Sequence, residues 1–234
     1  MALSIDYLGH SGFFVETDRA LMLFDYFRGD ISFISRRQDD KPLYVFVSHA
    51  HRDHFNPAIF ALSNGKRTVK FLLSFDINGD DAVPDGLDIS YLDADKEYSV
   101  EGLGSVRTLV STDEGAAFLV SSPNAVLFHA GDLNWWNWPG EDEAWLNEQE
   151  RVFKREIAKI ADAPIDAAFI VLDDRLEENY DSGMKYFLSV CRAKCVLPMH
   201  FTRGESSVQR FMKDTPDASA IILDTSRKTH FDIN

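Results

Sequence analysis

The sequence predicts a four-layer αββα sandwich, in which two β-sheets pack face to face and helices cover their outer surfaces. Apolar β-prone runs dominate the first hundred residues, whereas helices and strands alternate in the second half. The 234 residues are 45% hydrophobic, which is enough for one large core. Because no linker-like or repeated stretch interrupts the chain, a single domain over residues 1–234 is expected.

The expected strands of the first half are short apolar runs separated by glycine or charged turn residues. The run from Leu43 to Val47 is apolar throughout, which is typical of an interior strand buried on both faces. Asn56 and Pro57 are typical of a helix cap and a first helical position, so a short helix through Phe60 and Leu62 is expected. The predicted strands span residues 3–8, 13–16, 20–24, 43–47, 69–73, 106–110, 117–120 and 125–128.

The second half begins with the longest predicted helix, over residues 142–161. Its apolar positions recur at helical spacing, with acidic residues at the start and basic ones further on, as the helix dipole favours. The elements expected after it are a strand at 167–172, a helix at 183–191, a strand at 195–199, a helix at 206–212 and a strand at 220–223.

The formal net charge of −14 disfavours binding to a phosphate backbone. The basic groups Arg36-Arg37 and Lys66-Arg67 with Lys70 are short and are interpreted as solvated turns. We therefore expect a small-molecule substrate and no nucleic-acid partner.

The two cysteines, Cys191 and Cys195, are interpreted as small hydrophobic residues of a protein in a reducing compartment. The N-terminus has no basic region followed by an apolar one, and no apolar run approaches 18 residues. A cytoplasmic protein with no membrane partner is expected.

Three of the seven histidines fall within six residues. His49, His51 and His54, together with Asp53, follow the strand at 43–47, and a strand end opening into a loop is where α/β proteins place their chemistry. Imidazole and carboxylate ligands suit zinc, iron or manganese. Such a grouping is improbable in a merely solvated turn, so a site for one metal or for two adjacent metals is predicted.

The pattern H-x-H-x-D-H at residues 49–54 resembles the signature of the metallo-β-lactamase superfamily, and the resemblance extends over nearly the whole chain. Gly9-His10 is similar to the opening segment of its lactonase-like and phospholipase-like branches, including the L-ascorbate-6-phosphate lactonase-like, Zn-dependent hydrolases. Asp25 looks like the aspartate of the strand that follows. Gly131-Asp132 resembles the motif whose carboxylate bridges two metals, and His200 resembles the late histidine after a strand.

The resemblance implies a role for each of these residues. His49 and His51 would bind one metal, Asp53, His54 and His200 the second, and Asp132 both. The implied cofactor is one or two zinc ions, with manganese or iron as alternatives. The implied activity is hydrolysis of an ester, lactone or phosphoester by a metal-bound hydroxide, with Asp53 and Asp132 as the catalytic carboxylates.

The chain departs from the pattern at one motif, because it has no histidine between His54 and His129. The superfamily takes a further ligand of the first metal from the corresponding loop, here residues 110–115. Asp113 or Glu114 could supply an oxygen instead, which would favour harder ions such as Mn²⁺. The alternative is a vacant or weakened first site.

Three further residues are expected near the ligands. Asp25 is expected to orient a ligating imidazole by accepting its other N–H. His10 is expected beside the ligands, although a simple turn residue is the alternative. His129 is expected either to line the pocket or to be structural.

The run from Trp135 to Trp138 contains three indoles. Trp135, Trp136 and Trp138 are expected to form a pocket wall or lid that stacks on an apolar or ring-shaped part of the substrate. Anchoring the helix that follows is an equally supported alternative.

The leading hypothesis for function is a metal-dependent hydrolase of a small molecule. A nuclease is disfavoured by the acidic charge and by the lack of a basic accessory domain. A degenerate, non-catalytic member that binds metal or ligand is credible because of the missing histidine. Diiron redox chemistry would usually need a partner flavin domain, which this chain lacks.

Overall fold

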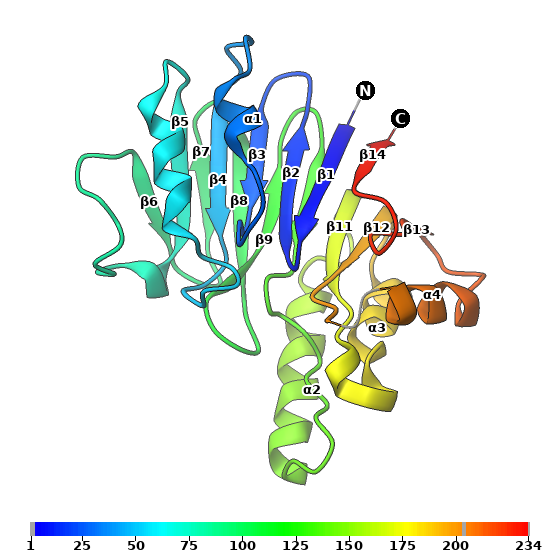
Figure 1. The fold of residues 1–234 in the computed structure, drawn as a ribbon. Helices are drawn as coiled ribbons and strands as arrows, with labels where there is room; N and C mark the ends of the chain where they lie inside the picture. Colours follow the sequence, from blue (N-terminus) through cyan, green and yellow to red (C-terminus); the bar gives the residue numbers. More distant parts are fainter. Residues whose placement is uncertain (1–2, 203–204, 234) are drawn as a thin grey trace.

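The computed structural model describes residues 3–202 and 205–233 and consists of two seven-stranded sheets that pack against each other (Figure 1). The first sheet has the order β14 (His230–Ile233), β1 (Leu3–Gly9), β2 (Gly12–Glu16), β3 (Leu21–Phe24), β4 (Leu43–Val47), β5 (Val69–Ser74), β6 (Ile89–Leu92). The second has the order β13 (Ile221–Ile222), β12 (Ala193–Met199), β11 (Ile165–Val171), β10 (Val126–His129), β9 (Ala116–Ser121), β8 (Gly104–Val110), β7 (Glu97–Val100).

Helices cover the outer faces of both sheets and complete the predicted four layers. On the first sheet lie α1 (Ser32–Ser35) and the 3₁₀ segment η1 (Pro57–Asn64), with η2 (Phe75–Ile77) after β5. On the second lie α2 (Glu143–Ala158), η3 (Asp174–Asn179), α3 (Ser182–Val190) and α4 (Glu205–Asp214). The predicted αββα architecture is thus confirmed.

Strand β4 shows why the layers form. Its residues Tyr44 and Phe46 belong to the core between the sheets, while Leu43, Val45 and Val47 belong to the core beneath α1 and η1. Side chains of a strand alternate between its two faces, so an apolar run of this kind is buried on both. The prediction of an interior strand is confirmed.

The predicted helix limits are close to the observed ones. Asp142 caps α2, since its side chain accepts hydrogen bonds from the backbone N–H groups of Ala144 and Trp145. Asn56 caps η1 with Pro57 at its start, but the predicted helix is a 3₁₀ helix, a form common in short segments. Strands β6, β7 and β14 were not predicted.

The two cysteines are free and buried, and their thiols contact backbone carbonyls of Ile157 and Asp166. They pack as the small hydrophobic residues that were predicted. Among the described residues, no helix is at once long enough and apolar enough to cross a bilayer.

Candidate metal centre

The candidate side chains all follow strands that run in one direction. β3 to β6 are parallel to one another, and so are β10 to β13. β2 is antiparallel to both β1 and β3, so β1 runs in the same direction as β3. β9 is likewise antiparallel to both β8 and β10, so β8 runs in the same direction as β10. Their carboxyl ends therefore meet at one edge of the sandwich, the lower edge in Figure 1. The residues gathered there are His10, Asp25, the 48–54 loop, Asp113, Asp132, Asp173 and His200.

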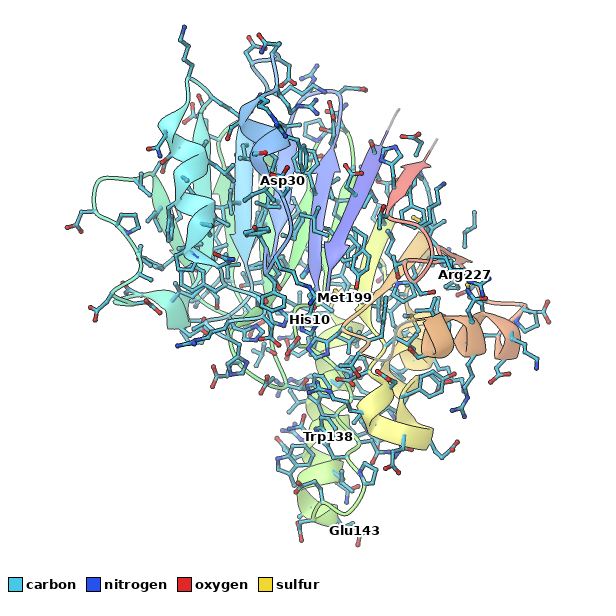
Figure 2. All side chains as sticks on the ribbon, in the orientation of Figure 1. His10, Asp30, Trp138, Glu143, Met199 and Arg227 are labelled. Atoms are coloured by element: carbon cyan, nitrogen blue, oxygen red, sulfur yellow. The ribbon has the colours of Figure 1, made fainter. Side chains whose placement is uncertain are left out.

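Figure 2 labels His10 and Met199 close together at this edge, and the backbone N–H of His200 donates to the carbonyl of His10 over 3.0 Å. This bond joins the end of β1 in one sheet to the end of β12 in the other. Residues from opposite ends of the chain thus enter one site.

One group of possible ligands, here called the inner cluster, consists of His10, Asp53, His54 and His200, whose ligand atoms lie within 4.8 Å of one another. Nε2 of His10 is 3.2 Å from Oδ2 of Asp53. Nε2 of His54 and Nε2 of His200 lie 3.2 and 3.3 Å from the carboxylate oxygens of Asp132. His10 was expected only beside the ligands, and the structure places its imidazole among them.

A second group, the outer cluster, consists of His49, His51, Asp113 and Asp132. Nε2 of His49 lies 3.0 Å from Nδ1 of His51 and 3.8 Å from Oδ2 of Asp132. The same Nδ1 of His51 is 3.7 Å from Oδ2 of Asp113. Asp132 thus lies between the two clusters, at the position expected for a bridging carboxylate.

The two acidic residues of the 111–115 loop face different atoms of His51. Asp113 faces Nδ1, the nitrogen directed at the cluster, whereas Glu114 lies 3.4 Å from Nε2 on the other side of the ring. Of the two alternatives for the missing histidine, only Asp113 brings its carboxylate to the cluster.

Unpartnered polar atoms test whether a cation fits between these groups. Nε2 of His10, Nε2 of His54 and Oδ1 of Asp132 are buried and lie 3.2 Å from atoms of neighbouring side chains, yet none makes a well-aligned hydrogen bond with a described residue. A buried polar atom without a partner costs free energy, which a bound cation coordinated by these atoms would offset. Imidazole nitrogens and carboxylate oxygens are suitable donors for zinc, manganese or iron, so the residues present fit a divalent metal.

Buried carboxylates hold two of the imidazoles from behind. Oδ2 of Asp25 lies 2.7 Å from Nδ1 of His54, and Oδ2 of Asp173 lies 3.0 Å from Nδ1 of His200. A proton on each Nδ1 leaves Nε2 free to face the cluster. Asp25 occupies the orienting position predicted for it, while Asp173 was not predicted.

The charges of the inner cluster are strongly coupled. Burial alone would lower the pKa of His200, but the Asp132 charge and hydrogen bonds to Asp132 and Asp173 raise this pKa to about 9. The pKa of His54 is raised in the same way by Asp132 and Asp25. The pKa of Asp132 is lowered because His54 and His200 outweigh the effect of its burial. Burial lowers the pKa of His49 to about 4.

Gly115 and Gly131 allow the loops of the two sheets to approach closely. A Cβ at Gly115 would lie 1.9 Å from the carbonyl oxygen of Ser48, and one at Gly131 would lie 2.7 Å from the Cβ of Ser48. Both glycines have a positive φ, which side-chain-bearing residues rarely adopt. The loop that carries Asp113 is thereby pressed against the histidine loop.

His129 is structural and not a pocket residue. Its Nδ1 accepts from the N–H of Gly131 over 3.1 Å, and its Nε2 donates to the carbonyl of Ser11 over 2.9 Å. The imidazole is fully buried, stacks on Phe24 with ring centroids 5.2 Å apart, and has a pKa lowered by that burial. It therefore links the two sheets as a neutral ring.

A cavity of about 270 Å³ opens beside the clusters. Its walls include His51, Asp53, Asp113, Asp132 and His200 from the clusters, together with Thr112, Trp136, Trp138, Trp145 and Arg175. Trp136 and Trp138 are in the expected place. Trp145 and Arg175 were not predicted there, since Trp145 was assigned only to the apolar face of a helix.

Trp135 does not line this cavity. Its ring packs beneath the ammonium of Lys154, 4.4 Å from the ring centroid, and the same ammonium lies 5.3 Å from the ring of Tyr186. Trp135 therefore fits the alternative of an anchor for α2, and Trp136 that of a pocket wall.

One further residue that the sequence did not indicate, Asp76, supports the histidine loop together with the predicted Asp25. Oδ2 of Asp76 accepts from the N–H of Ala50 over 2.8 Å, and the Ser48 backbone N–H donates to Oδ1 of Asp25 over 2.7 Å. The only sequence signal was that Asp76, like Asp25, closely follows an apolar strand.

Comparison with solved structures shows the fold. A metallo hydrolase from the hyperthermophilic archaeon Ignicoccus hospitalis matches with a TM-score of 0.68 at 16% identity, covering 100% of both chains. The Zn²⁺-bound PqqB from Methylobacterium extorquens matches with a TM-score of 0.58 at 13% identity, over 100% of both chains. A diiron β-hydroxylase from Streptomyces venezuelae matches with a TM-score of 0.61 at 15% identity, over 99% of this chain and 54% of that one.

No curated protein matches the sequence of this chain. The family model described as the beta-lactamase superfamily domain matches residues 4–200, from the first strand to the late histidine. This chain belongs to the beta-lactamase superfamily.

Proposed function

We propose that this protein is a metal-dependent hydrolase of a small-molecule ester, lactone or phosphoester. The observation that carries the proposal is the pair of clusters with Asp132 between them, in which buried polar atoms make no hydrogen bond with the described residues. Divalent cations in such a site supply Lewis acidity, polarising a carbonyl or phosphoryl group and lowering the pKa of water. Zinc is the proposed ion, with manganese or iron as alternatives.

The protein's own residues would perform two tasks. Asp25 and Asp173 hold the imidazoles of His54 and His200 in one orientation. Asp53 lies at the cavity wall, and although burial alone would raise its pKa, the neighbouring charge of His54 lowers it. Its carboxylate is therefore ionised at neutral pH and is the proposed acceptor for a proton released in the reaction.

The proposed site also suggests where the substrate enters. His51 and Asp113 are exposed, whereas His54 and His200 are buried. A scissile group would approach from the outer cluster and the cavity beside it. A lactone substrate of the kind used by the lactonase-like branch is the first to test, and a cytoplasmic location is proposed with it from the two free thiols.

Elemental analysis of the purified protein, followed by assays of lactones, phosphodiesters and thioesters with added Zn²⁺ or Mn²⁺, tests the proposal. The variants His54→Ala and His200→Ala should lose metal and hydrolysis together. His230→Ala is the matched control, because that histidine is exposed on β14, away from both clusters. A wild-type protein that takes up no stoichiometric metal would instead be a non-catalytic ligand-binding member of the superfamily.

A second candidate function is oxidation at a pair of iron ions. The specific observation in its favour is Asp113, which adds a carboxylate to the outer cluster, because oxygen donors favour iron and manganese over zinc. The structural likeness to a diiron β-hydroxylase adds to its interest. Retention of iron after purification, with no hydrolysis under any metal, would favour this candidate.

A further inference from the structure

The cavity beside the clusters carries one cationic side chain whose position is fixed. Arg175 is the single lysine or arginine among the residues that line it. Its Nε lies 2.9 Å from both carboxylate oxygens of Asp173, and its Nη2 lies 2.5 Å from Oδ2. Asp173 is fully buried and also contacts His200, so it holds the guanidinium at a fixed position relative to the inner cluster.

The guanidinium keeps donor capacity that Asp173 does not use. Nη1 of Arg175 donates to no residue in the described ranges 3–202 and 205–233, and 47% of the side chain is exposed. Guanidinium groups bind carboxylate and phosphate oxygens through two parallel N–H bonds. In a chain with a net charge of −14, a cation fixed at the mouth of an acidic site is unlike its surroundings.

Flat apolar side chains face the same space. The rings of Trp136 and Trp138 are stacked with centroids 5.7 Å apart and planes 4° from parallel, and Arg175 lies 5.4 Å from the ring of Trp138. Nε1 of Trp136 donates to the backbone carbonyl of Asp132 over 3.0 Å, which fixes this ring to the loop that carries Asp132. Trp145, on the first turn of α2, is 38% exposed although it is large and apolar. In Figure 2, Trp138 lies below the strand edge, towards α2.

We propose that Arg175 and these indoles form a recognition subsite for a small anion that carries a flat ring. The carboxylate or phosphate of the ligand would bind the guanidinium, and its ring would stack on Trp138. The cavity volume of about 270 Å³ suits a ligand of metabolite size. The inference rests on the proposed function in that this ligand is the substrate, and it narrows the substrate to ring-bearing acids.

Equilibrium binding to Zn²⁺-loaded protein, followed by the tryptophan fluorescence, tests the subsite without requiring turnover. The probes are phenylacetate, phenyl phosphate and the neutral phenylacetamide, with acetate and inorganic phosphate as ring-free anions. We expect the ring-bearing anions to bind about tenfold more tightly than the amide, as a charge-assisted hydrogen bond would provide. The tighter of the two anions identifies the acid group.

Two pairs of variants separate this subsite from direct binding to the metal. Arg175→Gln should weaken phenylacetate binding about tenfold, whereas Arg210→Gln should not. Arg210 is a matched control because it also lies over an aromatic ring, that of Tyr180, and pairs with an acid, Glu178. Trp138→Ala should weaken the ring-bearing anions about fivefold and leave acetate unchanged, with Trp135→Ala as its control.

Metal content is measured for every variant, because Arg175 also supports Asp173. If Arg175→Gln loses metal, Arg175→Lys replaces it as the test variant, because lysine keeps a charge beside Asp173 but lacks the planar guanidinium. Arg175→Lys should retain metal and bind the anions several-fold more weakly than the wild type does. Equal affinity for phenylacetate and its amide, or unchanged anion binding in a metal-replete Arg175 variant, would overturn the subsite. Absence of metal uptake or hydrolysis would instead count against the proposed function, so the two failures are distinguishable.

Discussion

The two ends of the sandwich use charged residues in opposite ways. At the carboxyl ends of the parallel strands, histidines and aspartates gather around buried polar atoms that make no hydrogen bond within the described part of the chain. At the amino ends of β3, β4 and β5, acidic and basic groups pair with each other. Arg37 contacts Glu16 and Asp39, Lys41 contacts Glu16, and Arg67 contacts Asp39.

The charged groups at the paired end therefore stabilise the fold, whereas those at the other end are available to bind a ligand. The hollow at the paired end, about 630 Å³ and lined by Arg37, Asp39 and Arg67, is larger than the cavity at the metal centre. Its two guanidinium groups are nevertheless bound to carboxylates and to backbone carbonyls. The volume of a cavity is therefore a poor guide to function, whereas buried polar atoms without hydrogen bonds are a better one.

The largest effect on metal content is expected from a substitution of Asp132, between the two clusters. Asp132→Asn should abolish hydrolysis and remove metal from both clusters, because Asp132 is the carboxylate between them. Asp39→Asn is the matched control at the paired end and should keep the full metal content. Elemental analysis of both variants provides the measurement, and a metal-replete Asp132→Asn protein would contradict the shared role.

A second test compares the two acids of the 111–115 loop. Asp113→Ala should lower the metal content of the outer cluster and leave the inner cluster loaded, because Asp113 faces the nitrogen of His51 that is directed at the outer cluster. Glu114→Ala should keep the wild-type content, since Glu114 faces the other nitrogen. Chelator competition on both proteins measures this, and a reversed order would assign the ligand to Glu114.

The orienting carboxylates should give smaller effects than the ligands. Asp25→Asn and Asp173→Asn should each weaken metal binding about 10–100-fold, because the imidazole orientation is loosened while its nitrogen remains. Metal affinity is measured by titration against a chromophoric chelator. Affinity within twofold of wild type in both variants would mean that packing alone positions His54 and His200.

The smallest expected effect concerns the paired end at low pH. Burial alone would raise the pKa of Asp39, but hydrogen bonds from Arg67 and Arg37 outweigh it and lower the pKa to about 2. A carboxyl with a depressed folded pKa stabilises the fold above its unfolded pKa of about 3.9, and this contribution is lost as the pH falls towards 2.

Asp39→Asn should therefore reduce the free energy of unfolding by about 0.5–1 kcal/mol at pH 7, a modest value because the pair is partly exposed. The difference from wild type should shrink towards zero between pH 4 and pH 2. Urea denaturation of both proteins across that range measures it. A difference that stays constant with pH would show that Asp39 acts through packing and not through its charge.

The layers and most strands could be predicted because buried elements have a recognisable local pattern of apolar residues, as in the 43–47 run. Strands β6, β7 and β14 could not, since they are half-exposed and short. β14 pairs residues 230–233 with residues 3–6, a contact between the two ends of the chain that no local pattern reports. Edge strands of this kind depend on their partner more than on their own residues.

The site shows the same division. The cluster at 49–54 and the pairing of Gly131 with Asp132 are local motifs and could be found. Asp173 and Arg175 could not, because their proximity to His200 comes from the parallel register of β11 with β12, in which Val171 lies beside Met199. The basic group Lys66-Arg67, interpreted as a solvated turn, contains in Arg67 a partner of Asp39.

The backbone at the metal centre places conformational stability and function in competition. His10, Asp25 and His200 have positive φ angles of 54°, 40° and 67°. A non-glycine residue held in this region stores on the order of 1–3 kcal/mol of strain. Glycine at His10 would release that strain, so variants selected for heat resistance without regard to metal should acquire glycine at this position. Glycine at His200 would instead leave the buried carboxylates of Asp132 and Asp173 without their imidazole partner. Selection for thermal stability alone would therefore tend to remove a histidine from the candidate metal centre.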